Sequence, residues 1–188
     1  GQMSTFTIRG VTQNDFNDIV ETPNAVYLDD GYLAIAASQT FAQFDLDRVE
    51  ILKGPQGTLF GRNATGGLVH FISNAPSFDG LEGYIDLEVG EFDSDANSTR
   101  TVLQAAVGGP LSETVAARAA IRVSQHDGYL KNLYTSSSQL PFLGDPGPDA
   151  GADLGDEDTI TGRVRFAFEP SDTLRMDLSF NYADQEMA

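Results

Sequence analysis

Several residue types are missing or scarce in this 188-residue sequence, and each absence excludes a class of protein. There is no Cys and no Trp, so disulfides, thiolate metal sites and thiol catalysis are excluded. Only 11 Lys and Arg stand against 28 Asp and Glu, and the formal charge of −17 makes nucleic acid a poor partner. The longest apolar runs, such as Leu33–Ala37, are far shorter than the roughly 20 residues of a membrane-spanning helix.

Hydrophobic residues nevertheless make up 40% of the chain, which indicates a folded protein rather than general disorder. The pattern changes near residue 80. Before it, short strand-like runs are separated by Gly, Pro and Asn, whereas after it apolar and polar residues alternate strictly. We therefore expect two domains, a mixed α+β domain over residues 1–79 and a set of antiparallel strands over residues 80–188.

The first region contains short runs that are typical of β-strands, namely Thr5–Arg9, Ala25–Leu28, Val49–Leu52 and Leu68–Ser73. Between them, Phe41, Phe44 and Leu46 have the spacing of one or two helical turns. The segment Gly54–Gly67 has five glycines and one proline in fourteen residues, and we expect it to form no regular element.

In the second region, alternation predicts five strands of about nine to eleven residues. They are Gly83–Phe92, Thr99–Val107, Val115–Val123, Ile160–Phe168 and Leu174–Tyr182. Two tight turns, Gly108–Glu113 and Glu169–Thr173, alternate with longer loops, Asp93–Ser98 and about His126–Asp158. Strand length and loop asymmetry favour transmembrane β-barrel strands, although a soluble β-sheet domain with one buried face produces the same alternation.

The segment Arg48–Pro76, RVEILKGPQGTLFGRNATGGLVHFISNAP, identifies the family that the sequence resembles. It resembles the plug-domain signature of TonB-dependent outer-membrane receptors. Two upstream segments, Phe6–Gly10 (FTIRG) and Val26–Gly31 (VYLDDG), also resemble plug segments and occur in the right order. The similarity is close over about residues 5–80, and the later strands match in pattern more than in residues.

The resemblance implies the C-terminal part of a plug domain over residues 1–79, without the first part of the plug, followed over residues 80–188 by the first five transmembrane strands of a β-barrel, hence a partial barrel. Barrels of this family have about 22 strands, so we expect the chain to be an internal fragment without the signal peptide and the TonB-contacting box. The implied function is TonB-dependent active import of a scarce solute, such as an iron–siderophore complex, across the bacterial outer membrane.

The resemblance also implies the partners: TonB, outer-membrane lipid and a small-molecule ligand such as a metal chelate. It implies no cofactor and no enzymatic activity, and no nucleophile motif or acid–base pair is found in the sequence. A β-sheet surface binding module without transport is the alternative.

Within the plug signature, the resemblance suggests that Arg62 pairs with barrel carboxylates and holds the plug, with Glu50 and Lys53 as neighbours. An ordinary solvated arginine is the alternative. The G-x-x-x-x-G-K-[ST] order of a phosphate-binding loop is missing, so nucleotide binding is not expected. Instead, we expect the glycines to let the backbone turn tightly against the barrel wall. The remaining motif residues are Gly54, Pro55, Gly57, Gly61, Gly66 and Gly67.

Four arginines on the polar side of the predicted strands are expected to face the barrel lumen. They are Arg118, Arg122, Arg163 and Arg165. Such a cluster could attract an anionic ligand such as a ferric chelate. The favoured alternative is pairing with acidic plug residues, for example Asp45, Asp47 or Asp79.

The predicted long loop carries acidic residues that could bind calcium, but the spacing of a calcium loop is absent and a solvated loop is favoured. These residues are Asp145, Asp149, Asp153, Asp156, Glu157 and Asp158. Neither His70 nor His126 has a second His nearby, so we expect no metal site at either.

Overall fold

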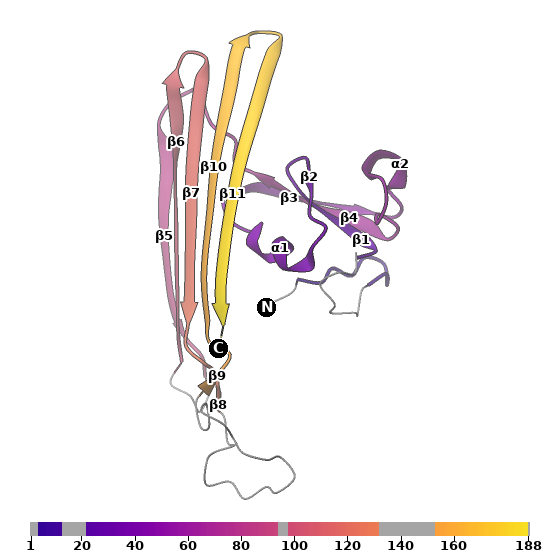
Figure 1. The fold of residues 1–188 in the computed structure, drawn as a ribbon, viewed down its shortest axis with the longest axis vertical. Helices are drawn as coiled ribbons and strands as arrows, with labels where there is room; N and C mark the ends of the chain where they lie inside the picture. Colours follow the sequence, from indigo (N-terminus) through magenta and orange to yellow (C-terminus); the bar gives the residue numbers. More distant parts are fainter. Residues whose placement is uncertain (1–3, 13–21, 94–97, 132–152, 188) are drawn as a thin grey trace, which may run out of the picture. The chain divides into compact units, whose positions relative to one another are not determined.

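The computed structural model describes residues 4–12, 22–93, 98–131 and 153–187, which form mostly antiparallel β-sheet with few helices (Figure 1). None of the helices it describes is long and apolar enough to cross a membrane. The chain divides into two compact units. The first contains residues 1–80, 109–118 and 165–178, and the second contains residues 81–108, 119–164 and 179–188.

A four-stranded sheet with the order β2-β1-β4-β3 lies in the first unit. Its strands are β1 (Asn24–Leu28), β2 (Gly31–Tyr32), β3 (Leu46–Lys53) and β4 (Gly67–Ser73). The central pair, β1 and β4, is parallel, and the two outer pairs are antiparallel. Two short helices, α1 (Ala36–Phe41) and α2 (Gly57–Phe60), belong to the same part of the chain (Figure 1).

The central strands of this sheet are covered on both faces, and their sequences are accordingly apolar in consecutive positions. On one face Val26, Val69 and Phe71 are buried together with Ile8 and Ala42. A second cluster contains Ala25, Leu68 and Ala64. The hydrophobic core therefore holds β1 and β4 in place, and both strands end at the same edge of the sheet.

The predicted strand at Thr5–Arg9 is wrong. Within that segment only Ile8 makes a β-bridge, an isolated one with Val11, around a turn at Arg9 and Gly10 whose backbones have positive φ angles. The apolar side chains that suggested a strand instead cover the sheet, since Ile8 belongs to its core.

Two further local predictions need correction. The helix ends at Phe41, so Phe44 lies in the following turn and Leu46 begins β3. Their helix-like spacing reflects burial, because Phe44 is 4% exposed and Leu46 packs against the core. The segment Gly54–Gly67, predicted to be irregular, contains the single turn of α2.

A five-stranded antiparallel sheet has the order β11-β10-β7-β6-β5, so each strand lies beside the next long strand of the chain (Figure 1). The strands are β5 (Glu82–Glu91), β6 (Thr99–Ser112), β7 (Val115–His126), β10 (Glu157–Ser171) and β11 (Leu174–Met187). All five predicted strands are confirmed, but four of them are longer than predicted. The predicted turns shorten to two residues because pairing continues almost to the end of each hairpin.

A small pair of strands lies inside the predicted long loop between β7 and β10. It joins β8 (Leu130–Lys131) to β9 (Asp153–Leu154). No sequence signal indicated this pair, because two residues are too few to show alternation.

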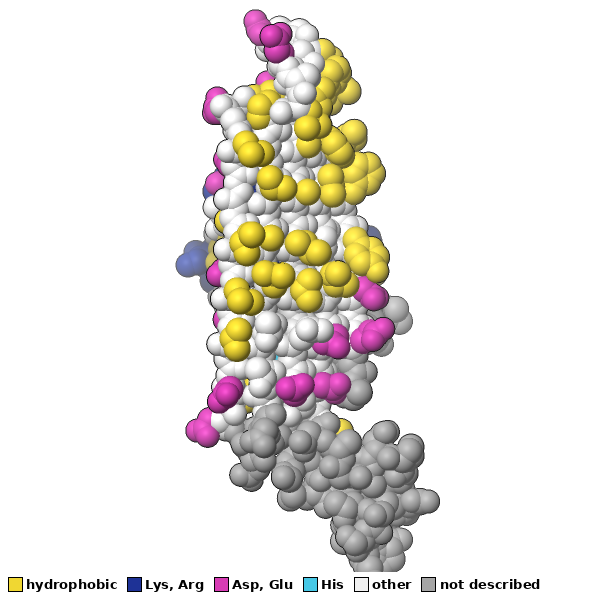
Figure 2. Space-filling model, turned by 90° about the vertical axis from the view of Figure 1, so that its left-hand side faces the viewer, with side chains coloured by type: hydrophobic (Ala, Val, Ile, Leu, Met, Phe, Trp, Pro, Cys, Tyr) yellow, Lys and Arg dark blue, Asp and Glu magenta, His cyan; other side chains and the backbone are white. Residues whose placement is uncertain are grey.

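The five-stranded sheet exposes apolar side chains on one face. Figure 2 shows hydrophobic side chains gathered across the middle of this face, with acidic ones toward its ends. Ile85 is 81% exposed, Leu87 is 64% exposed and Phe180 is 63% exposed. The opposite face buries polar and charged side chains, namely Arg118, Ser124, Thr159, Thr161 and Arg163. This distribution is the reverse of that in a sheet with a solvated outer face and an apolar core.

Candidate functional site

Two aspartates flank the strands of the four-stranded sheet at one edge. Asp29 directly follows β1, and Asp45 directly precedes β3. Both have left-handed backbones, with φ of 51° and 48°. Asp tolerates this conformation better than most residues do. The local turns therefore bring two carboxylates to the edge at which β4 ends.

Ser73, the last residue of β4, and Asn74, which follows it, each bind one of the two aspartates. The backbone N–H of Ser73 donates to Asp29 Oδ1 at 2.9 Å, and its hydroxyl donates to Asp29 Oδ2 at 2.9 Å. The backbone N–H of Asn74 donates to the Asp45 carbonyl at 3.1 Å, and its side-chain amide donates to Asp45 Oδ1 at 2.9 Å. Asp29, Asp45, Ser73 and Asn74 thus form one hydrogen-bonded set at the end of three strands.

Arg118 on β7 makes a two-point contact with this set. Its Nε donates to Asp45 Oδ2 at 2.9 Å, and its Nη2 donates to Asp45 Oδ1 at 2.6 Å. The two side chains are 6% and 1% exposed. A two-point contact between a guanidinium and a carboxylate fixes orientation as well as distance, and here it is shielded from water.

Arg165 on β10 binds the same edge. Its Nη1 donates to the hydroxyl of Ser73 at 2.6 Å, to the Ser73 carbonyl at 3.0 Å and to the Asn74 carbonyl at 3.4 Å. The same nitrogen lies 3.6 Å from Asp29 Oδ1. We refer to the six residues Asp29, Asp45, Ser73, Asn74, Arg118 and Arg165 as the arginine–aspartate cluster. All six belong to the first unit.

The other two candidate arginines belong to the second unit and have different surroundings. Arg163 is 2% exposed, and its Nε donates to Asn181 Oδ1 at 2.8 Å. Arg122 is half-buried, and its carbonyl accepts a hydrogen bond from the hydroxyl of Thr161 at 3.3 Å. Arg118 has the partner, Asp45, that the sequence analysis named in its favoured alternative of pairing with acidic plug residues.

The charged residues of the plug signature lie apart from this cluster in the sequence. Arg62 is exposed after α2, and Lys53 is exposed at the end of β3. Glu50 contacts Arg48, with Arg48 Nε donating to Glu50 Oε1 at 2.8 Å. Two hydrogen bonds to Glu50 and Asp47 raise the pKa of Arg48 above its usual value.

Some glycines of the signature are required by close packing. A Cβ at Gly66 would overlap the side chains of Asn24 and Val11, and one at Gly67 would overlap the Leu52 carbonyl. At these two positions the close neighbours belong to the domain itself. The others lie around α2: Gly54 is buried, Pro55 is exposed, Gly57 begins the helix and Gly61 ends it.

The loop between Gly54 and Gly67 is closed by its own hydrogen bonds. The N–H of Gly54 donates to the Gly66 carbonyl, and the N–H of Gln56 donates to the Ala64 carbonyl, both at 2.9 Å. The hydroxyl of Tyr27 donates to the Phe60 carbonyl at 2.7 Å. These contacts give the motif a structural role in holding the loop.

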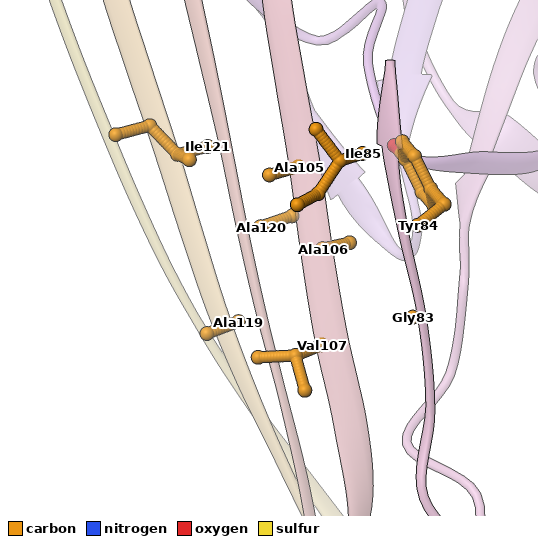
Figure 3. A pocket seen from close by; sticks show the side chains of 9 residues that line it. All are labelled: Gly83, Tyr84, Ile85, Ala105, Ala106, Val107, Ala119, Ala120 and Ile121. Carbon is orange, nitrogen blue, oxygen red and sulfur yellow. The ribbon is translucent and has the colours of Figure 1, made fainter.

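The apolar face of the second unit has a shallow hollow of about 710 Å³ (Figure 3). It forms where small side chains on β5, β6 and β7 leave space between larger ones. The residues around it are Gly83, Tyr84, Ile85, Ala105, Ala106, Val107, Ala119, Ala120 and Ile121. Figure 3 shows Ile85, Val107 and Ile121 as the large apolar side chains of this area.

Within the described ranges, no three His, Asp or Glu side chains are grouped in a way that could hold a metal ion. His126 Nε2 lies 3.7 Å from Glu157 Oε2, and His70 Nε2 contacts the Asp29 carbonyl. The acidic loop residues Asp145 and Asp149 lie outside the described residues.

Sequence reasoning missed Asp29, Ser73 and Asn74. Ser, Asp and Asn directly after an apolar strand are the usual residues of tight turns, which was the only available signal. Their joint role depends on which strands are neighbours, since β1 and β4 are far apart in sequence but parallel and adjacent in space.

Comparison with known proteins agrees with this architecture. A family model described as TonB-dependent Receptor Plug Domain matches residues 1–68. The pesticin receptor of Yersinia pestis is 28% identical over 172 residues, which cover 90% of this chain and 22% of that receptor. The structure of the ferric yersiniabactin uptake receptor from Yersinia pestis has a TM-score of 0.71 at 25% identity, covering 97% of this chain and 26% of that one.

The pyoverdine outer membrane receptor from Pseudomonas aeruginosa has the same fold over 96% of this chain, with a TM-score of 0.60 at 18% identity. The chain covers 22% of that receptor. It therefore spans about a quarter of the length of the proteins that it matches.

Proposed function

Because the chain carries a TonB-dependent receptor plug domain over residues 1–68 and is related to the pesticin receptors, we propose that it acts in TonB-dependent import. The imported solute is an iron–siderophore complex, and the membrane crossed is the bacterial outer membrane. In this proposal residues 1–79 are the plug and residues 80–188 are the first five strands of a transmembrane barrel. The protein moves its ligand without making or breaking a covalent bond.

One observation carries the proposal: charged side chains of the five-stranded sheet bind the plug domain while the other face of that sheet is apolar. Arg118 and Arg165 lie on β7 and β10, and both bind residues at one edge of the plug sheet. A water-filled barrel that contains a plug requires this polarity, with a polar interior and an apolar band toward lipid. A β-sheet binding module in water would cover its apolar face with a second layer.

The arginine–aspartate cluster then holds the plug in its closed position. Separating Arg118 from Asp45 leaves two charges without partners in a poorly hydrated place, which costs about 3–5 kcal/mol. TonB supplies the energy to separate them in this proposal. Arg62 is a second holding residue in this proposal, as the resemblance to plug domains suggests, and it lies exposed after α2.

Uptake by cells tests the proposal. The full-length receptor is expressed in a strain without its own ferric siderophore receptors, and cells are supplied with ⁵⁵Fe-labelled ferric yersiniabactin or other ferric siderophores. We expect iron accumulation that depends on the receptor and disappears in a strain without TonB. Iron accumulation that is equal with and without TonB for every chelate would contradict the proposal.

A further inference from the structure

The two arginines of the arginine–aspartate cluster face each other across neighbouring strands. The backbone N–H of Glu169 on β10 donates to the carbonyl of Thr114, which directly precedes β7, at 2.8 Å. Moving four residues along each antiparallel strand from this bond places Arg118 opposite Arg165. Like charges directly opposite each other on one face of a sheet are destabilising, so this arrangement requires compensation.

The plug provides that compensation with oxygen atoms. Arg118 donates hydrogen bonds to both carboxylate oxygens of Asp45. Arg165 donates to the Ser73 hydroxyl and to two backbone carbonyls, and its Nη1 lies 3.6 Å from the Asp29 carboxylate. Asn74 links the two halves, because its amide binds Asp45 while its carbonyl accepts from Arg165. The pair of guanidinium groups is therefore occupied by the plug much as it would be by a bound anion.

The hydrogen-bond donors of Arg165 are only partly used. Among the residues that the structure describes, Nε of Arg165 is buried and has no hydrogen-bond partner. All the hydrogen bonds recorded for Arg165 come from Nη1. A planar carboxylate that accepted from both Nε and a terminal nitrogen would satisfy this guanidinium better than the plug does.

We propose that Arg118 and Arg165 form an anion-binding site for carboxylate groups, which the plug fills with its own oxygens in the closed state. When the plug withdraws, the site becomes free to take a carboxylate of an anionic ligand that passes through the barrel. The proposal rests on the proposed transport function, and it adds a transit site and a chemical class of ligand. A ligand carboxylate and the plug carboxylates then compete for the same two arginines.

Chemical rescue tests the site directly in the full-length receptor. Asp45→Ala removes the carboxylate that occupies Arg118 and lowers the urea midpoint at which the plug unfolds. Formate has the size and charge of the missing group, and we expect it to restore the midpoint toward the wild-type value. With only three heavy atoms, formate cannot bind with a dissociation constant much tighter than about 1 mM, so concentrations up to several hundred millimolar are compared with sodium chloride at equal ionic strength.

The matched control is the double variant Asp45→Ala with Arg118→Gln, in which formate should have no effect beyond that of chloride. Asp45→Asn keeps an acceptor beside Arg118 and provides a folded reference if the alanine variant fails to fold. In that case, a smaller formate effect in Asp45→Asn with Arg118→Gln than in Asp45→Asn supports the site. Equal shifts with formate and chloride, or equal formate shifts with and without Arg118, would overturn it. Because the readout is plug stability, a receptor that imports nothing can still show rescue, and a working importer without rescue refutes only this site.

Discussion

In the four-stranded sheet the fully buried side chains include Val26 and Leu68, whereas in the five-stranded sheet they include Thr161 and Arg163. The five-stranded sheet instead exposes apolar side chains, since its Ile85 and Leu87 are among the most exposed large apolar residues. Both sheets have strands with alternating or continuous apolar residues, so the pattern alone does not reveal which face is buried. The comparison teaches that one sheet is stabilised by an apolar core, whereas the other buries polar and charged side chains on one face and exposes apolar ones on the other, where the proposed barrel would face lipid.

The largest effect is expected from a charge in the apolar core of the four-stranded sheet. Val26 lies on β1, one of the two central strands that are covered on both faces, and is 0% exposed. Val26→Asp would bury a carboxylate without a partner and should cost more than about 4 kcal/mol, enough to prevent the plug from folding. Protease digestion of the full-length receptor in vesicles measures this as loss of a protected plug fragment.

The conservative control is Val26→Ala, which should leave the fragment protected. If Val26→Asp were as resistant to protease as the wild type, the four-stranded sheet would not be held by its apolar core.

A smaller effect is expected where a buried charge has a partner. Arg118→Gln leaves Asp45 buried without its guanidinium and should lower the free energy of plug unfolding by about 3–5 kcal/mol. Urea titration of the full-length receptor measures the change. Arg175→Gln is the matched control, because Arg175 pairs with Glu169 and Asp177 while its side chain is 46% exposed. Equal losses in the two variants would show that burial of the Arg118–Asp45 pair is unimportant.

The smallest effect is expected on the apolar face. Leu87→Arg places a charge where the proposed barrel faces lipid, which costs about 2–4 kcal/mol at the bilayer midplane and less toward either surface. The cost should appear in lipid vesicles, as a lower urea midpoint for barrel unfolding. Asp86→Arg changes the preceding position, whose side chain points to the opposite face of the strand, and should cost less. An equal cost at both positions would remove the distinction between the two faces.

Much of the five-stranded sheet could be predicted from the sequence because alternation has a period of two and persists for many residues. The strand ends could not, since a Gly108-Gly109-Pro110 sequence suggests a turn and yet lies within β6. Where the strand ends depends on its hydrogen bonds to the neighbouring strand of the hairpin, and the composition of the segment does not reveal these bonds.

The first region was predicted less well. The apolar side chains of Thr5–Arg9 and Phe44–Leu46 are buried against or packed on a core, and such burial occurs whichever backbone conformation the segment adopts. The plug signature indicated the family but not the arginine–aspartate cluster. That cluster depends on two left-handed aspartates and on β1 lying parallel to β4, which are tertiary features.

The shared edge of the plug sheet has a mechanical consequence. Asp29, Asp45 and Asn74 lie at the ends of three different strands. Ser73 binds Asp29 and Asn74 binds Asp45, both also bind Arg165, and Arg118 binds Asp45. A pulling force that reaches this edge is divided among parallel attachments instead of loading each bond in turn. Bonds arranged in parallel rupture together and at a higher force than any one of them alone. The contacts at this edge should therefore resist a small force together and break in one step when the force exceeds their combined strength.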